Sequence, residues 1–159
     1  MVPYEIHFLR VPAGRTYDEV LDDINAAYDP DADPEPMRLT AGQRAVWERL
    51  VRRVGEAVGG PVECEEYPSC LTLCRTAPPG YLQLDYDGDS AALQVAYRHA
   101  GPDARRAAEE LYRVARMVEA ETGLQGYDGQ AGQPVATGAV DRAAAALGGV
   151  SRWAQENLT

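Results

Sequence analysis

Apolar and polar residues alternate at the start of the chain, where Tyr4, Ile6 and Phe8 are separated by polar side chains. A period of two is typical of a β-strand with one buried face. We therefore expect a short strand here, with its apolar side chains in the core. His7 should point to the polar side of this strand.

Four other segments carry apolar residues at helical spacing. The first two begin with the sequence of a capping box, Thr16 with Glu19 and Thr40 with Gln43. In this motif the threonine hydroxyl accepts a hydrogen bond from a free backbone N–H, and the second side chain reaches back. The third begins with Pro and Asp, which suit a helix N-terminus, and the fourth is rich in alanine. We expect helices over residues 16–27, 40–58, 102–122 and 140–157.

The strongest hairpin signal lies at residues 87–90, a turn-forming Asp-Gly-Asp-Ser sequence between two alternating segments. The alternation divides the hairpin into two faces. One face should be buried and holds Leu82, Leu84, Tyr86, Leu93, Val95 and Tyr97. The other should contact water and holds Gln83, Asp85, Gln94 and Arg98.

Shorter strand-like segments occur at residues 62–67 and 71–76, joined by a Pro-Ser turn, and at residues 124–127 and 133–135. Because adjacent strands are joined by tight turns, the sheet should be antiparallel. We expect an α+β fold in which an antiparallel sheet of about four to six strands carries helices packed on one face. Neither an internal repeat nor a long linker divides the sequence, so residues 1–159 should form a single domain.

The chain has 159 residues, with 15 basic and 25 acidic side chains and a formal net charge of −10. Nucleic acids and anionic membranes are bound chiefly by clustered basic side chains, so this charge argues against both as partners. A protein partner, and a basic one in particular, suits the composition better, while the acidic charge also serves solubility. The sequence contains no membrane-spanning apolar run and starts without the features of a signal peptide, so we expect a cytoplasmic location.

Two oppositely charged segments follow each other along the chain. Residues 18–35 carry eight carboxylates, and the second expected helix carries Arg44, Arg49, Arg52 and Arg53. The two segments either pair with each other or form a solvated face or a charged docking surface.

The cysteines and histidines give little support to catalysis. Cys64, Cys70 and Cys74 do not form two zinc-type pairs. Two residues four apart on a strand lie about 13 Å apart, too far for a disulfide or a shared ion. His7 would act as a base for Cys70 or Cys74 only if the fold brings them together.

Other site motifs are incomplete. The aspartate series that begin at Asp29 and Asp85 have the odd-position spacing of a calcium loop, but lack its central glycine and its final glutamate. The three serines lie outside any nucleophile elbow, and no glycine-rich phosphate loop precedes a helix. We therefore expect no catalytic residue, no metal and no cofactor.

Two segments carry a resemblance to a known group of proteins. They are residues 81–88, Tyr-Leu-Gln-Leu-Asp-Tyr-Asp-Gly, and residues 121–132, Glu-Thr-Gly-Leu-Gln-Gly-Tyr-Asp-Gly-Gln-Ala-Gly. The chain resembles a loose group of small bacterial proteins with a hairpin, a long helix and a Thr-Gly…Tyr-Asp-Pro-Gln-Thr-Gly tail. Here Gly129 and Ala131 replace the proline and the second threonine of that tail. Some members look like immunity proteins that accompany polymorphic toxins, so the resemblance implies a domain that occludes a protein partner.

On this interpretation the partner-binding residues are Gln83, Asp85, Asp87, Gln94, Arg98, Tyr127 and Asp128. A structural role also fits the last two, with Tyr127 packing its strand against a helix and Asp128 capping the following turn. A second function remains open, that of a small enzyme or ligand-binding protein with a pocket between sheet and helices. Its candidate residues are His7, Cys70, Cys74 and Asp85.

Overall fold

The computed structural model describes residues 3–77, 80–96 and 102–157, without the side chains of residues 102 and 150–157. Within these residues the chain forms an antiparallel sheet of seven strands in the order β2-β3-β4-β5-β1-β6-β7. The strands are β1 (Tyr4–Leu9), β2 (Glu63–Glu66), β3 (Leu71–Arg75), β4 (Leu82–Tyr86), β5 (Ser90–Val95), β6 (Gln125–Asp128) and β7 (Gln133–Pro134). The helices are α1 (Tyr17–Ala27), α2 (Ala41–Val58), α3 (Pro102–Thr122) and α4 (Val140–Asn157). The α+β fold is thus confirmed, and the strand beyond the expected range is the two-residue β7.

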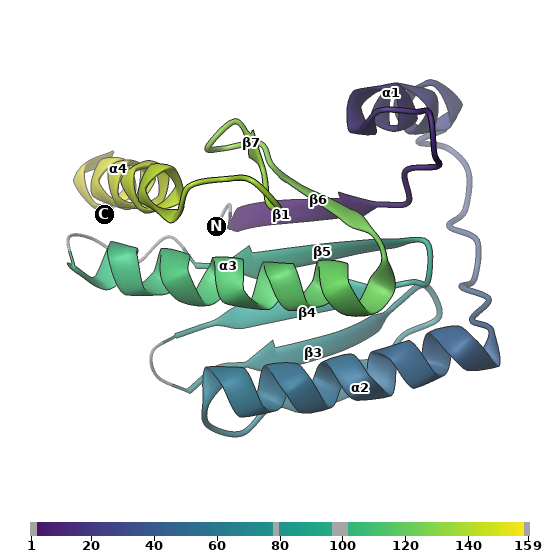
Figure 1. Ribbon diagram of the computed structural model, residues 1–159, viewed down its shortest axis with the longest axis horizontal. Coiled ribbons are helices and arrows are strands. Elements are labelled where there is room, and N and C mark those ends of the chain that lie inside the picture. The colour runs from purple at the N-terminus through teal and green to yellow at the C-terminus, as the bar shows by residue number, and fades with distance from the viewer. Residues whose placement is uncertain (1–2, 78–79, 97–101, 158–159) are drawn as a thin grey trace.

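Three helices cover one face of the sheet, with α3 over its middle, α2 over the β3 side and α4 beside α3 (Figure 1). The apolar residues that alternate along β1, Tyr4, Ile6 and Phe8, are completely buried beneath this layer. Trp47 of α2 stacks on Tyr86 of β4, with ring centroids 5.9 Å apart. Burial of one large apolar side chain stabilises a fold by about 1.5–3 kcal/mol, so this core holds the two layers together.

The β4–β5 hairpin has the two faces that its sequence predicts. Leu84 pairs with Leu93 on the face beneath the helices, and Gln83 pairs with Gln94 on the opposite face. Tyr97 lies outside the described residues. We call the side of the sheet that points away from α2, α3 and α4 the open face.

Both predicted capping boxes are formed. Thr16 Oγ1 accepts from the backbone N–H of Glu19 at 3.2 Å, and the Glu19 carboxylate accepts from the backbone N–H of Thr16 at 3.1 Å. Thr40 and Gln43 make the equivalent bonds at 3.1 and 2.9 Å. Each box satisfies two backbone donors that a helix start leaves free, which is why α1 and α2 begin where the sequence predicts.

Helix α1 stands apart from the other three, beyond the end of β1 (Figure 1). Its first residue, Tyr17, is buried and stacks on Tyr127 of β6, with ring centroids 5.5 Å apart. Tyr127 pairs with His7 of β1, so both side chains belong to the open face. The expectation that the helices pack on one face of the sheet therefore holds for α2, α3 and α4. Helix α1 contacts the open face instead.

A charged side chain, Arg75, lies inside the core. It is 2% exposed and belongs to the face of β3 beneath the helices. Its guanidinium donates to the carbonyl of Gly80 at 2.7 and 2.9 Å and to that of Val58 at 3.3 Å. It also pairs with Glu110 of α3 at 2.7 Å. These partners satisfy the buried charge. Arg75, which belongs to β3, therefore connects this strand to the end of α2 and to α3.

Candidate functional site

A row of hydrogen-bonded polar side chains lies on the open face of β3 and β4. Asp85 accepts from Thr72 Oγ1 at 2.7 Å and from Gln83 Nε2 at 3.0 and 3.1 Å. The Tyr81 hydroxyl donates to Gln83 Oε1. Gln94 lies opposite Gln83 on the neighbouring strand. The structure therefore brings three predicted partner-binding residues together, Gln83, Asp85 and Gln94, but the first two are bonded to each other and to their neighbours.

A hollow of about 180 Å³ lies beside this row on the open face. Its lining includes His7, Cys70 and Asp85, which come from different parts of the sheet. Ala92 of β5 pairs with Asp85 on one side and with His7 on the other. A small side chain thus separates two larger ones, which is the physical reason for the hollow.

The contacts in this hollow do not assemble a nucleophile and a base. The His7 imidazole lies 3.1 Å from the Glu5 carboxylate, and the His7 side chain is 58% exposed. The Cys70 sulfur lies 3.6 Å from Thr72 Oγ1, and no contact within the described part of the chain joins His7 to a thiol. Burial raises the pKa of the Cys74 thiol, which keeps that thiol protonated and weakly nucleophilic at neutral pH.

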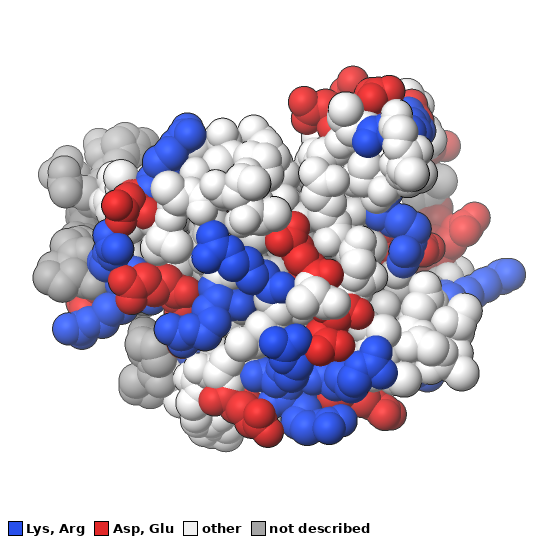
Figure 2. All heavy atoms as spheres, viewed as in Figure 1, with Lys and Arg blue, Asp and Glu red and all other residues white. Residues whose placement is uncertain are grey.

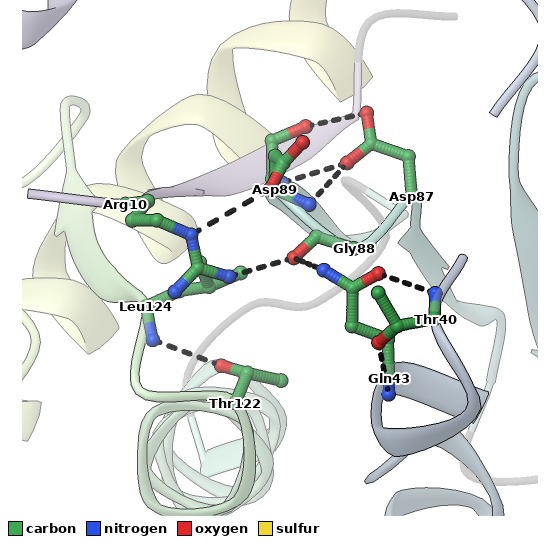
Figure 3. Close-up of polar contacts among 9 residues, drawn as sticks. Arg10, Thr40, Gln43, Asp87, Gly88, Asp89, Thr122 and Leu124 are labelled. Carbon is green, nitrogen blue, oxygen red and sulfur yellow. Dashed lines mark hydrogen bonds and ion pairs between the residues drawn. The ribbon is translucent and has the colours of Figure 1, made fainter. Parts of the chain in front are cut away.

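Asp87 stabilises the turn of the β4–β5 hairpin. Its carboxylate accepts from two backbone N–H groups of the same turn at 2.9 and 2.7 Å, as expected for an aspartate in a turn. The turn is also held from outside, because the Gly88 carbonyl accepts from Arg10 at 2.9 Å and from Gln43 at 3.3 Å (Figure 3). The last predicted residue of the hairpin, Arg98, lies outside the described residues.

Asp128 is fully buried and serves the fold. Its carboxylate accepts from the Tyr4 hydroxyl at 2.7 Å, from the Tyr112 hydroxyl at 2.5 Å and from the backbone N–H of Ala131 at 3.1 Å. The bond from Ala131 caps the turn after β6, as the structural interpretation predicts. Burial, and then the bond to Asp128, raises the pKa of the Tyr112 hydroxyl. Asp128 therefore has no exposed surface to offer a partner.

The partly buried ring of Tyr127 stacks on Tyr17 and so connects the open face to α1. Beyond Tyr17 the large apolar side chains on this side of α1 are exposed, Leu21 to 36%, Ile24 to 47% and Tyr28, just after the helix, to 73%. Residues at this spacing lie along one side of a helix. The stripe that would normally pack against a core therefore contacts water.

Carboxylates occupy the other side of α1 and the loop that follows it. All eight carboxylates of residues 18–35 are exposed, and Asp23 pairs with Arg15 at 2.6 Å. Within the described part of the chain, the α2 arginines form ion pairs with Glu66 and Glu121, at distances of 2.8–3.2 Å. The alternative in which the two segments pair with each other is therefore wrong, because α1 and α2 lie at different places on the sheet. We call residues 17–35 the acidic arm.

The uncovered stripe of the acidic arm was missed by the sequence patterns. Helical periodicity places Leu21 and Ile24 on the apolar side of the first helix, but does not say whether anything covers that side. A signal was present in the next segment, where prolines at positions 30, 34 and 36 prevent a helix or a strand from continuing. Such a segment keeps the first helix apart from the second, so the second helix does not cover the apolar side of the first.

Metal and membrane sites find no support in the described residues. No group of three or more His, Cys, Asp or Glu side chains among them is arranged to hold a metal ion. None of the helices, as far as they are described, is long and apolar enough to cross a membrane. Comparison of the chain with protein-family models, with curated proteins and with solved structures finds no match.

Proposed function

We propose that this protein is a non-catalytic protein-binding domain that binds a basic protein partner through its acidic arm. The observation that carries the proposal is the uncovered apolar stripe of α1. A helix of 11 residues has little stability of its own in water and normally depends on the packing of its apolar side. Apolar side chains that lie together on a surface, with polar residues around them, commonly mark a protein interface.

The chemistry of the acidic arm defines the class of partner. Leu21, Ile24 and Tyr28 supply an apolar centre, and tyrosine is a frequent anchor of protein interfaces. The carboxylates of the same arm add negative charge near this centre, which favours a partner that carries Lys and Arg beside its apolar side chains. Opposite charges on the two proteins raise the rate of association more than the final affinity.

An immunity-type role is consistent with this arrangement. A protein that neutralises a toxin needs no nucleophile or cofactor, and it acts by covering the site of its partner. The sequence resemblance to small immunity-type proteins supports the same class, and an acidic arm matches the basic surface of a toxin that acts on nucleic acid.

An enzymatic or ligand-binding role has less support. The hollow that contains His7, Cys70 and Asp85 lies on the open face, whereas that role expects a pocket between the sheet and the helices. His7 is engaged by Glu5, and Asp85 is engaged by Thr72. These contacts favour a structural row of polar side chains over a reactive pair.

The test is affinity purification from the producing strain with the wild-type protein and with a Leu21→Ser/Ile24→Ser variant. This variant keeps the charge and removes the apolar centre. Tyr67→Ser is the matched control, since Tyr67 is 45% exposed in the turn between β2 and β3, at the opposite edge of the sheet from β6. Both variants should unfold at the wild-type urea concentration, because the replaced side chains are exposed.

We expect a stoichiometric basic protein with the wild type and the control, and its loss with the double variant. The association rate of that pair should fall as salt is added. Recovery of no stoichiometric partner would overturn the proposal, and so would a partner that the double variant binds as tightly as the wild type.

A further inference from the structure

The layer of helices differs in charge from the rest of the molecule. Helices α2, α3 and α4 contain ten of the 15 arginines and nine of the 25 carboxylates, so the strands, the loops and α1 carry the net negative charge. In Figure 2 arginines and carboxylates alternate over α2 and α3, and carboxylates gather over α1. The three helices together are close to neutral, with one more arginine than carboxylates, on a chain whose formal net charge is −10.

A groove of about 460 Å³ lies in this layer, between α2, α3 and the start of α4. Three arginines, one glutamate and two apolar residues line it, namely Arg53, Arg113, Arg116, Glu109, Met117 and Val140. Binding sites for small molecules have volumes of roughly 300–1,000 Å³, so the groove is large enough for a ligand beyond a single ion.

The carboxylates near the groove do not neutralise its arginines. Glu109 is already paired with Arg105 at 2.9 Å. Arg53 pairs with Glu121 at 2.8 Å, but Arg49 shares the same carboxylate at 3.2 Å. Two guanidinium groups therefore face one carboxylate at this end of the groove, which leaves an excess of positive charge.

The other two arginines form no ion pair within the described part of the chain. Arg116 donates to the carbonyl of Gly138 at 3.0 Å, and its guanidinium lies 5.6 Å from the centre of the Tyr112 ring. These contacts orient Arg116, which forms no ion pair among the described residues, although its charge also acts on the Glu119 carboxylate. Arg113 is exposed and has no carboxylate partner within the described part of the chain. The groove thus presents one oriented guanidinium and one available guanidinium side by side.

We propose that this groove binds a small phosphorylated ligand that carries at least two negative charges. The planar fork of an arginine matches the oxygen atoms of phosphate, and an oriented fork loses less freedom on binding. Met117 and Val140 provide an apolar surface for the organic part of the ligand.

Calorimetric titration of the whole protein with pyrophosphate, with ATP and with inorganic phosphate tests the proposal. We expect saturable binding of pyrophosphate and ATP, and weaker binding of inorganic phosphate because it reaches fewer guanidinium groups. Arg113→Gln should weaken pyrophosphate binding about tenfold, since a charge-assisted contact is lost. Arg38→Gln is the matched control, because Arg38 is an exposed arginine in the loop before α2, outside the groove. It should leave the affinity unchanged.

Three outcomes would overturn the proposal. The first is that neither pyrophosphate nor ATP binds saturably. The second is that Arg113→Gln and Arg38→Gln weaken pyrophosphate binding equally. The third is that a short RNA binds more tightly than ATP and depends on Arg113 in the same way. The last result would assign the groove to nucleic acid. The Leu21→Ser/Ile24→Ser variant should bind pyrophosphate normally, so the groove is tested independently of the acidic arm.

Discussion

Replacement of Tyr112 by phenylalanine removes one hydroxyl from the surroundings of the buried Asp128 carboxylate. Within the described residues three donors reach this carboxylate, the hydroxyls of Tyr4 and Tyr112 and the backbone N–H of Ala131. They join β1, α3 and the turn after β6. A charge in such a position is tolerated only while its hydrogen bonds are made, so the stability of the fold should depend on each donor.

The contacts give the size of the effect. A hydrogen bond to a charged group contributes about 1.5–3 kcal/mol to stability. The Tyr112 hydroxyl donates to Asp128 at 2.5 Å and accepts from Gln133 Nε2 at 2.7 Å. Gln133 keeps its second bond, to the Ala139 carbonyl at 2.8 Å, so the lost bond to the carboxylate dominates. We expect Tyr112→Phe to lower the free energy of unfolding by about 2–3 kcal/mol.

Urea unfolding at neutral pH, followed by circular dichroism, measures this change. Tyr127→Phe is the matched control, because within the described residues the Tyr127 hydroxyl has no hydrogen-bond partner. The control should change the free energy of unfolding by less than about 0.5 kcal/mol. A loss below about 0.5 kcal/mol for Tyr112→Phe, or one equal to that of the control, would refute the account of Asp128.

Alkaline pH provides a second test. Burial raises the pKa of Tyr17 and of Tyr112. These two side chains therefore keep their protons in the folded protein at a pH where the unfolded chain has lost them. The stability that these two tyrosines contribute should hold up to about pH 10 and be lost above it, so urea midpoints above about pH 10 should fall less steeply in Tyr112→Phe; an equal slope would contradict the pKa shift. At acid pH, Arg53 and Arg49 hold the pKa of Glu121 below its usual value of 4.5, so the stability from this group is lost as the pH falls through the lowered pKa. Glu121→Gln should therefore show a smaller loss of stability than the wild type between about pH 5 and pH 3, and identical pH profiles would rule out the contribution. Gly88→Ala should cost about 2 kcal/mol, since Gly88 has a φ of 99° and an added Cβ would lie 2.9 Å from Leu39. Gly129→Ala, where an added Cβ meets nothing within 4 Å, should cost less than about 0.5 kcal/mol, and equal losses would show that the turn is not held as described.

Local rules predicted the parts of the fold that depend on a few neighbouring residues. A strand points successive side chains to opposite faces whatever its neighbours are, so the alternation placed Gln83, Asp85 and Gln94 on one face. The capping boxes at Thr16 and Thr40 are likewise complete within four residues. These features need no knowledge of the tertiary structure.

The contacts of the candidate site could not be predicted in this way, because they join distant segments. β1 lies between β5 and β6, and this order brings His7 beside Ala92 and Tyr127. Asp128 precedes a glycine and therefore has the local sequence of a turn residue, but it is bonded to Tyr4, which is 124 positions away. Nothing local distinguishes such an aspartate from an exposed one.

The central position of β1 has a consequence for the order in which the protein folds. Its two partner strands occur much later in the chain, since Tyr4 pairs with Val95 and His7 pairs with Tyr127. Contacts of such long sequence separation slow folding, because a large loop closes before they form. Without β1 the sheet consists of two separate parts, β2-β3-β4-β5 and β6-β7. The strand that leaves the ribosome first among those described is therefore the one whose insertion joins the two parts into a single sheet.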